Sequence, residues 1–113
     1  MGNHFVRVND TESFKALTER SNERPVVIFK HSLTCPISSA AYEEMSRYEG
    51  EVSLIEVQVS RQLSSEIENQ LGVPHESPQV IVLSKGQAAW DASHFKITAE
   101  SVAEAVRTVA GSE

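Results

Sequence analysis

Two stretches of four consecutive apolar residues, at positions 26–29 and 80–83, constrain the fold of this chain more than any other feature. A strand that is apolar at every position has neither face in water. Such strands are typical of the centre of a sheet that helices cover on both sides. The sequence therefore predicts an α/β protein in which these two stretches are inner strands.

The remaining patterns place strands and helices in alternation around these two stretches. In chain order they predict a strand at 4–8, a helix at 11–20 capped by Asp10, a strand at 26–29, a helix from Pro36 that Gly50 ends, a strand at 52–59, a helix between Ser60 and Gly72, strands at 80–83 and 88–91, and a helix capped by Thr98. Alternation in the first part implies parallel pairing, and the later hairpin adds antiparallel pairing. We expect a central mixed β-sheet flanked by helices, with residues 1–113 forming one domain.

Composition limits the partners of this domain. The formal net charge is −6, and the basic residues are scattered rather than clustered, which argues against nucleic acid or an anionic membrane as a partner. No segment has the length of a transmembrane helix. The residues from Met1 to Val6 lack the basic and apolar regions of a secretory signal, so we expect a cytoplasmic, reducing location.

The chemistry of the chain is expected at Cys35, its only cysteine. Cys35 falls between the strand at 26–29 and a helix that begins at Pro36, and proline is well suited to the first helical position. A cysteine is mostly protonated at neutral pH, but the N–H groups and dipole of a helix N-terminus favour its thiolate. Most lone cysteines are inert packing residues. The setting between strand and helix favours a reactive thiol at the edge of the domain instead.

Other candidate residues surround Cys35 in the sequence. Ser38 would lie in the first helical turn, where its hydroxyl or N–H can donate to the sulfur. His31 is expected in a loop, pointing to solvent. Trp90 and Phe95 are expected to pack in the core or at an edge. The acidic residues Glu43 and Glu44 are expected to lie on a solvated helix face. The histidines do not have the spacing of metal ligands, so no metal site is expected from His4, His31, His75 and His94.

Two motifs of the chain are specific, Thr34-Cys35-Pro36-Ile37-Ser38 and His75-Glu76-Ser77-Pro78-Gln79. They give the sequence a resemblance to the YtxJ-type, monothiol bacilliredoxin family of the thioredoxin-like superfamily. Phe29-Lys30-His31-Ser32, Gly72-Val73, Trp90, Ala92-Ser93-His94 and Ile97-Thr98 add to it. Thioredoxins carry Cys-x-x-Cys, whereas this chain has Ser38 in place of the second cysteine. The resemblance implies a thioredoxin-like fold.

The resemblance also implies a function, a thiol–disulfide oxidoreductase that removes bacillithiol from mixed disulfides on proteins by a monothiol mechanism. Cys35 would be the catalytic nucleophile. Residues that would shape the site or stabilise the thiolate are Thr34, Pro36, Ser38, Ser77 and Pro78, with a cis Ser77–Pro78 bond as the family expectation. Residues that would contact the small thiol are His31, His75 and Glu76. No bound cofactor or metal is expected, because bacillithiol would be a redox co-substrate. The partners would be S-bacillithiolated proteins and bacillithiol. The protein is expected to be a monomer.

Two functions of other classes stay open at this point. The missing second cysteine also fits a non-catalytic thioredoxin-fold module that binds a partner peptide in the Cys35/Pro78 groove. A dimer that holds an iron–sulfur cluster between two Cys35 thiolates is less well supported, because Pro36 and Ile37 replace the glycine and phenylalanine of the Cys-Gly-Phe-Ser motif found in cluster-binding monothiol glutaredoxins.

Overall fold

The computed structural model describes residues 4–112 of the chain, so the first three residues used in the targeting prediction and the last residue of the predicted domain lie outside the described part. The elements are β1 (Phe5–Arg7), α1 (Thr11–Arg20), β2 (Val26–His31), α2 (Pro36–Arg47), β3 (Val52–Glu56), α3 (Arg61–Leu71), β4 (Gln79–Ser84), β5 (Gln87–Ser93), the short 3-10 helix η1 (His94–Lys96) and α4 (Ala99–Ser112). None of the helices among residues 4–112 is both long and apolar enough to cross a membrane.

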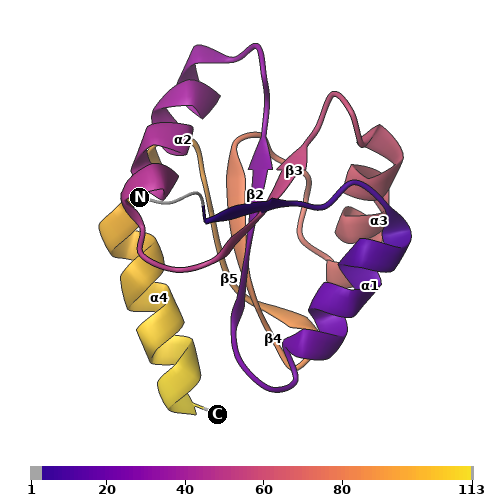
Figure 1. Cartoon of the computed structure of the whole chain (residues 1–113), viewed down its shortest axis with the longest axis vertical. Coiled ribbons are helices and arrows are strands. Elements are labelled where there is room, and N and C mark those ends of the chain that lie inside the picture. The colour runs from indigo at the N-terminus through magenta and orange to yellow at the C-terminus, as the bar shows by residue number, and fades with distance from the viewer. Residues whose placement is uncertain (1–3, 113) are drawn as a thin grey trace.

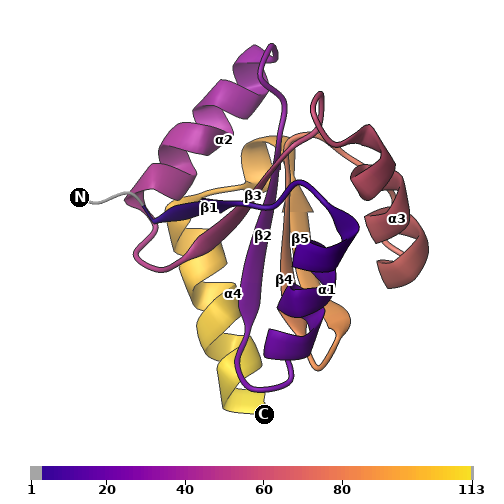
Figure 2. The same cartoon turned by 45° about the vertical axis from the view of Figure 1, so that its right-hand side comes forward.

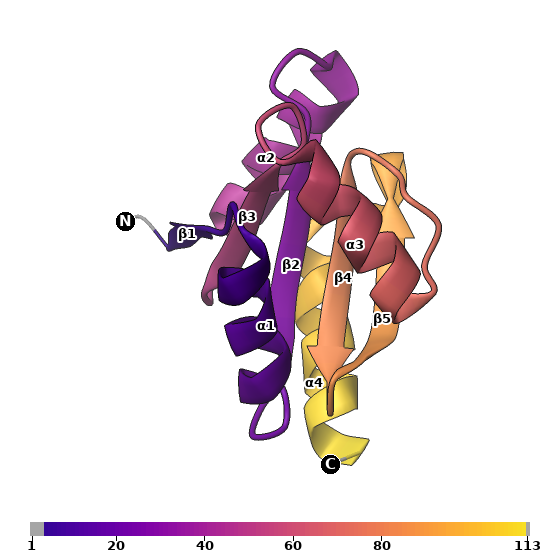
Figure 3. The same ribbon diagram turned by 90° about the vertical axis from the view of Figure 1, so that its right-hand side faces the viewer.

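The strands form one mixed sheet in the order β1-β3-β2-β4-β5 (Figure 1). The pairs β1–β3 and β2–β3 are parallel, whereas β2–β4 and β4–β5 are antiparallel. Helices α1 and α3 lie on one face of the sheet, and α2 and α4 lie on the other, as Figures 2 and 3 show from two further sides. The predicted mixed sheet with flanking helices is confirmed.

The two wholly apolar stretches became the adjacent inner strands β2 and β4. Phe29 and Val82 belong to the apolar cluster beneath α2 and α4. Ile28 and Ile81 point to the opposite face and belong to the cluster beneath α1 and α3. All four side chains are fully buried, so each contributes roughly 1.5–3 kcal/mol of hydrophobic stabilisation. An apolar residue occupies every position of the two four-residue stretches, 26–29 and 80–83, because neither face of the sheet meets water there.

Three of the helix ends predicted from local sequence signals are confirmed. The Asp10 carboxylate accepts a hydrogen bond from the Ser13 N–H at 2.8 Å and caps α1. Gly72 closes α3 in the left-handed region at φ 71°. The Thr98 hydroxyl accepts from the Ser101 N–H at 2.9 Å and caps α4.

The predicted end of the second helix is wrong by two residues. Helix α2 ends at Arg47, and its C-cap is Tyr48 rather than Gly50. Gly50 has φ 156°, and a Cβ at this position would lie 2.9 Å from the Tyr48 ring. The glycine is therefore required by the loop that passes over Tyr48 and not by the helix end.

The predicted third strand is also too long. Strand β3 ends at Glu56, because the N–H groups of Val59 and Ser60 both donate to the Glu56 carbonyl at 3.0 Å and turn the chain. Val59 consequently lies 62% exposed. Ser60 precedes α3 as predicted, but its hydroxyl donates to Asn9 and does not cap the helix.

Candidate active site

Cys35 occupies the N-cap of α2, directly after the loop that leaves β2 at the top of the view in Figure 1. Its carbonyl accepts a hydrogen bond from the Ser39 N–H at 3.0 Å, so its backbone already belongs to the helix. Pro36 is exposed at the first helical position. The Cys35 thiol is half-buried, carries no disulfide and makes no capping hydrogen bond. Its sulfur is therefore available for chemistry at the helix N-terminus, the position predicted from the sequence.

The hydroxyl of Ser38 connects the first turn of α2 to the end of β2 and to the start of the loop before Cys35. Ser38 Oγ lies 2.7 Å from His31 Nδ1, at the end of β2, and accepts a hydrogen bond from the Ser32 N–H at 2.9 Å. We call these three residues the Ser38 clasp. Ser38 is fully buried, and the hydrogen bonds of its hydroxyl go to His31 and Ser32 rather than to the Cys35 sulfur. The residue in place of a second cysteine thus fastens the loop.

The expectation that His31 points to solvent is wrong. His31 is the last residue of β2, is only 8% exposed, and packs its ring 5.0 Å from that of Tyr42. Burial lowers the pKa of His31, and the nearby Glu56 carboxylate opposes the shift only in part. A neutral imidazole at pH 7 follows, which suits a hydrogen-bonding role within the clasp better than a charged one.

Gln58 braces the same loop from the start of the β3–α3 connection. Its Oε1 accepts from the Leu33 N–H at 3.0 Å, and its Nε2 donates to Ser32 Oγ at 2.9 Å and to Thr34 Oγ1 at 3.2 Å. The exposed Thr34 is therefore held through its hydroxyl, one residue before the cysteine. Gln58 could not be recognised from the sequence, because nothing in the local pattern distinguishes it from any polar loop residue.

The loop with two prolines meets the sheet at the same end as the cysteine loop. The Ser77–Pro78 peptide bond is cis, as the family resemblance implied. Pro78 is buried, and its carbonyl accepts from the His94 N–H at 3.1 Å. Lys30 pairs with Gln79 across β2 and β4, which places Pro78 beside the end of β2. Ser77 Oγ is buried and has no hydrogen-bond partner among residues 4–112.

A buried lysine is linked to this proline loop through the side chain of Gln79. Lys30 has no exposed surface, and its Nζ donates to Gln79 Oε1 at 2.9 Å. Gln79 in turn donates to the Pro74 carbonyl at 3.1 Å and accepts from the Glu76 N–H at 3.4 Å. Burial lowers the pKa of Lys30 to about 8, and Glu68 and Glu76 act in the opposite direction. This network was not predicted from the sequence, although a lysine directly after an apolar inner stretch is a signal for it.

The predicted small-thiol contacts His75 and Glu76 have different neighbours. The His75 N–H donates to Glu68 Oε2 at 3.2 Å, and His75 lines a pocket against α3 that Cys35 does not line. Burial lowers the pKa of His75, and the charge of Lys30 adds to this effect. Glu76 Oε1 lies 3.8 Å from His94 Nε2. Across residues 4–112, no group of three or more His, Cys, Asp or Glu side chains is arranged to hold a metal ion.

A groove of about 200 Å³ separates the first turns of α2 from η1. Ile37 from α2 and Phe95 from η1 line it. The expectation that Phe95 packs in the core or at an edge is wrong, because its side chain is 76% exposed. Trp90 does pack against the cluster beneath α2 and α4, as predicted. An exposed aromatic ring therefore borders the helix turn that follows Cys35.

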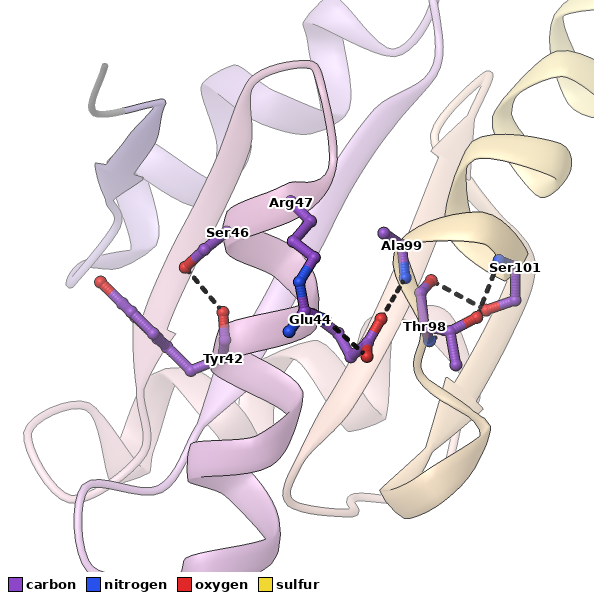
Figure 4. A network of polar contacts seen from close by, with 7 residues as sticks. All are labelled: Tyr42, Glu44, Ser46, Arg47, Thr98, Ala99 and Ser101. Atoms are coloured by element: carbon purple, nitrogen blue, oxygen red, sulfur yellow. Dashed lines mark hydrogen bonds and ion pairs between the residues drawn. The ribbon is translucent and has the colours of Figure 1, made fainter. Parts of the chain in front are cut away.

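Glu44 lines this groove, and its carboxylate forms hydrogen bonds as well as meeting solvent. Its carboxylate accepts from the Ala99 N–H at 3.0 Å and from Arg47 Nη1 at 2.9 Å (Figure 4). The expected solvated face therefore includes a side chain that ties α2 to the first turn of α4. Glu43 on the same helix remains exposed, as predicted.

A cysteine at the start of the helix after a central strand, beside a cis-proline loop that precedes the adjacent strand, defines a protein of the thioredoxin fold class. Solved structures agree. A structure described as a candidate oxidoreductase with a thioredoxin fold has a TM-score of 0.83 at 30% identity, with coverage of 90% of this chain and 93% of that one. Thioredoxin from Trypanosoma brucei brucei (TM-score 0.74, 14% identity, 93% and 89% coverage) and thioredoxin from Fasciola hepatica (0.71, 10%, 91% and 97%) share the fold.

The family can be stated more closely. The model of the family described as monothiol bacilliredoxin BrxC matches residues 6–102, most of the chain. The chain belongs to the monothiol bacilliredoxin family. Family and fold together support a thiol–disulfide redox function.

Proposed function

We propose that this protein removes bacillithiol from mixed disulfides on other proteins, and that Cys35 alone carries the exchange. The observation that carries the proposal is the state of the Cys-Pro-Ile-Ser turn. The Cys35 thiol lies at the N-terminus of α2 and makes no capping hydrogen bond. Ser38 occupies the position of a second thiol, and its hydroxyl forms hydrogen bonds with His31 and Ser32 in the clasp. Nothing in this turn can resolve a mixed disulfide from within the chain.

The proposed reaction has two exchange steps. In the first, the Cys35 thiolate attacks the bacillithiol sulfur of the mixed disulfide. The Cys35–bacillithiol bond forms, the old disulfide bond breaks, and the substrate cysteine leaves as a thiolate that takes up a proton. In the second, a bacillithiol thiolate attacks the Cys35–bacillithiol disulfide and releases Cys35 together with bacillithiol disulfide. Both steps conserve electrons, so no bound cofactor is needed.

The surrounding residues have positioning roles in this proposal. Thr34 and Pro36 fix the cysteine between the braced loop and the helix, and Ser77 and Pro78 form the neighbouring wall. Cys35 occupies the N-cap of α2, so its thiol lies at the N-terminus of that helix. His31 acts through the Ser38 clasp rather than as a direct contact of the small thiol.

The groove between α2 and η1 is the proposed docking surface for the substrate protein. Ile37 and the exposed Phe95 offer an apolar contact next to the helix turn that carries Cys35. Exposed apolar surface rimmed by polar groups is typical of protein contact sites. Because the exchange requires a pool of reduced bacillithiol, we place the activity in the cytoplasm.

The stoichiometry of a single round of exchange tests the monothiol route. The wild-type protein and Cys35→Ser are mixed in turn with excess bacillithiolated substrate, first without and then with reduced bacillithiol. We expect the wild type to release one substrate thiol per Cys35, stop, and turn over only after bacillithiol is added. Continued turnover without added thiol contradicts the monothiol route. Absence of any transfer by the folded protein instead favours the non-catalytic binding module.

A further inference from the structure

A second cavity lies on the opposite side of the cysteine loop from the docking groove. This pocket of about 370 Å³ lies between the first two turns of α3 and the proline loop. We call it the α3 pocket and define it by the lining residues Gln58, Arg61, Ser64, Glu68 and His75. The exchange proposed above does not use any of its helix residues.

The α3 pocket carries a positive charge that is not neutralised by an ion pair. Arg61 is exposed, and among residues 4–112 it makes no ion pair with an acidic side chain. Lys30 lies buried nearby, close enough for its charge to act on Glu68 and His75. Glu68 is the one acidic side chain that lines the pocket, and it accepts the His75 N–H at 3.2 Å. The guanidinium of Arg61 is thus available to a carboxylate ligand.

A buried hydroxyl without a partner also lines this pocket. Ser64 is only 6% exposed, and its Oγ has no hydrogen-bond partner within the described chain. Buried polar atoms are nearly always hydrogen-bonded, so each exception calls for an explanation. Ser64 follows Arg61 by three residues on α3, so both side chains lie on the same helix face. A polar ligand in the pocket would supply the missing partner.

Gln58 connects the α3 pocket to the cysteine loop. It lines the pocket and also binds Ser32, Leu33 and Thr34, the residues directly before Cys35. The β2–α2 and β3–α3 loops lie together at the top of Figure 3, where α3 begins. Gln58 is therefore in contact both with the residues directly before Cys35 and with the pocket that Arg61 lines.

We infer that the α3 pocket binds the carboxylate-bearing end of the small thiol, with Arg61 as its principal contact and the Ser64 hydroxyl as a hydrogen-bonding partner. The inference rests on the proposed function for the identity of that thiol, bacillithiol, whose malate group carries two carboxylates. Its sulfur would meet Cys35 while the malate lies in the pocket. Arg61 is then a specificity residue for the small thiol and has no part in breaking the disulfide.

Kinetics with two small thiols test the assignment. The substrates are one protein carrying either a bacillithiol or an uncharged 2-mercaptoethanol mixed disulfide, and the variants are Arg61→Ala, Arg61→Lys and Ser64→Ala. A hydrogen bond to a charged group is worth roughly 1.5–3 kcal/mol, so Arg61→Ala should raise KM for the bacillithiol substrate about tenfold or more. The same variant should leave kcat and the 2-mercaptoethanol reaction unchanged. Arg61→Lys should recover part of the loss, and Ser64→Ala should raise KM less than Arg61→Ala.

Arg107→Ala is the matched control, since Arg107 is an exposed arginine on α4, across the sheet. It should leave both reactions unchanged. Equal KM values for Arg61→Ala and Arg107→Ala would overturn the assignment, as would equal losses for both substrates.

A binding measurement separates this inference from the proposed reaction. S-methyl bacillithiol cannot exchange, so its affinity for the wild type and for Arg61→Ala reports the pocket alone. A loss of affinity of about tenfold in Arg61→Ala supports the assignment even if no thiol transfer occurs. Equal affinity for both proteins overturns it even if transfer is efficient.

Discussion

Replacing Ser38 by alanine removes the centre of the clasp that closes the loop before Cys35. The variant loses the 2.7 Å hydrogen bond with His31 and the 2.9 Å hydrogen bond from the Ser32 N–H. A net stabilisation of about 1 kcal/mol per hydrogen bond gives about 2 kcal/mol for the pair. His31 is only 8% exposed, so its bare ring nitrogen cannot readily find water, and this adds about 1 kcal/mol.

We therefore expect Ser38→Ala to lower the free energy of unfolding by about 2–3 kcal/mol, measured by urea denaturation at pH 7. Ser39→Ala is the matched control, because Ser39 is the next residue of the same helix and its side chain is exposed. The control should change the free energy of unfolding by less than about 0.5 kcal/mol.

A double-mutant cycle with His31→Phe isolates the contact. In that background Ser38→Ala loses only the Ser32 hydrogen bond, so its cost should fall by about 1 kcal/mol or more. The reasoning is refuted if Ser38→Ala is no more destabilising than Ser39→Ala. A coupling energy of zero between positions 31 and 38 would refute it equally.

Three further predictions concern buried charge and helix capping. Burial lowers the pKa of His31, so the unfolded chain binds a proton at this imidazole at a higher pH than the folded chain does. The free energy of unfolding should therefore decline between about pH 7 and 5, and His31→Phe should lack that part of the decline. Lys30 has a pKa of about 8 when folded against a reference of 10.5, so its contribution to stability should rise from pH 8 to 10.5, and Lys30→Met should abolish that rise in urea titrations. Glu44→Ala removes the acceptor of the Ala99 N–H and should cost about 0.5–1 kcal/mol in urea unfolding, whereas Glu43→Ala should cost little.

The framework of the fold could be predicted because neighbours in the sequence determine it. A strand with apolar residues on both faces must be covered on both faces, so β2 and β4 were assigned to the centre of the sheet. Asp10, Pro36 and Gly72 mark helix ends through their own backbone and side-chain chemistry. Strand β3 was predicted too long because apolar residues alternate through Val59, while the turn at Glu56 depends on hydrogen bonds that periodicity does not reveal.

The site was predicted in position but not in its contacts. Cys35 and Pro78 lie at the same end of the sheet, as expected. The partners of Ser38 and the bracing by Gln58 could not be predicted, because they join residues that only the packing of β2, α2 and the β3–α3 loop brings together. Phe95 was assigned to packing because aromatic side chains usually are, although η1 carries it to the surface.

The most direct test of the central claim is the intact mass of the protein after mixing with a bacillithiolated substrate. Cys35→Ser is the control, and a glutathionylated form of the same substrate is run in parallel. We expect the wild type to gain one bacillithiol as the substrate loses it, Cys35→Ser to gain none, and glutathione to transfer poorly. Removal of bacillithiol by Cys35→Ser at the wild-type rate would contradict a catalytic role for Cys35, as would a folded wild-type protein that gains no bacillithiol.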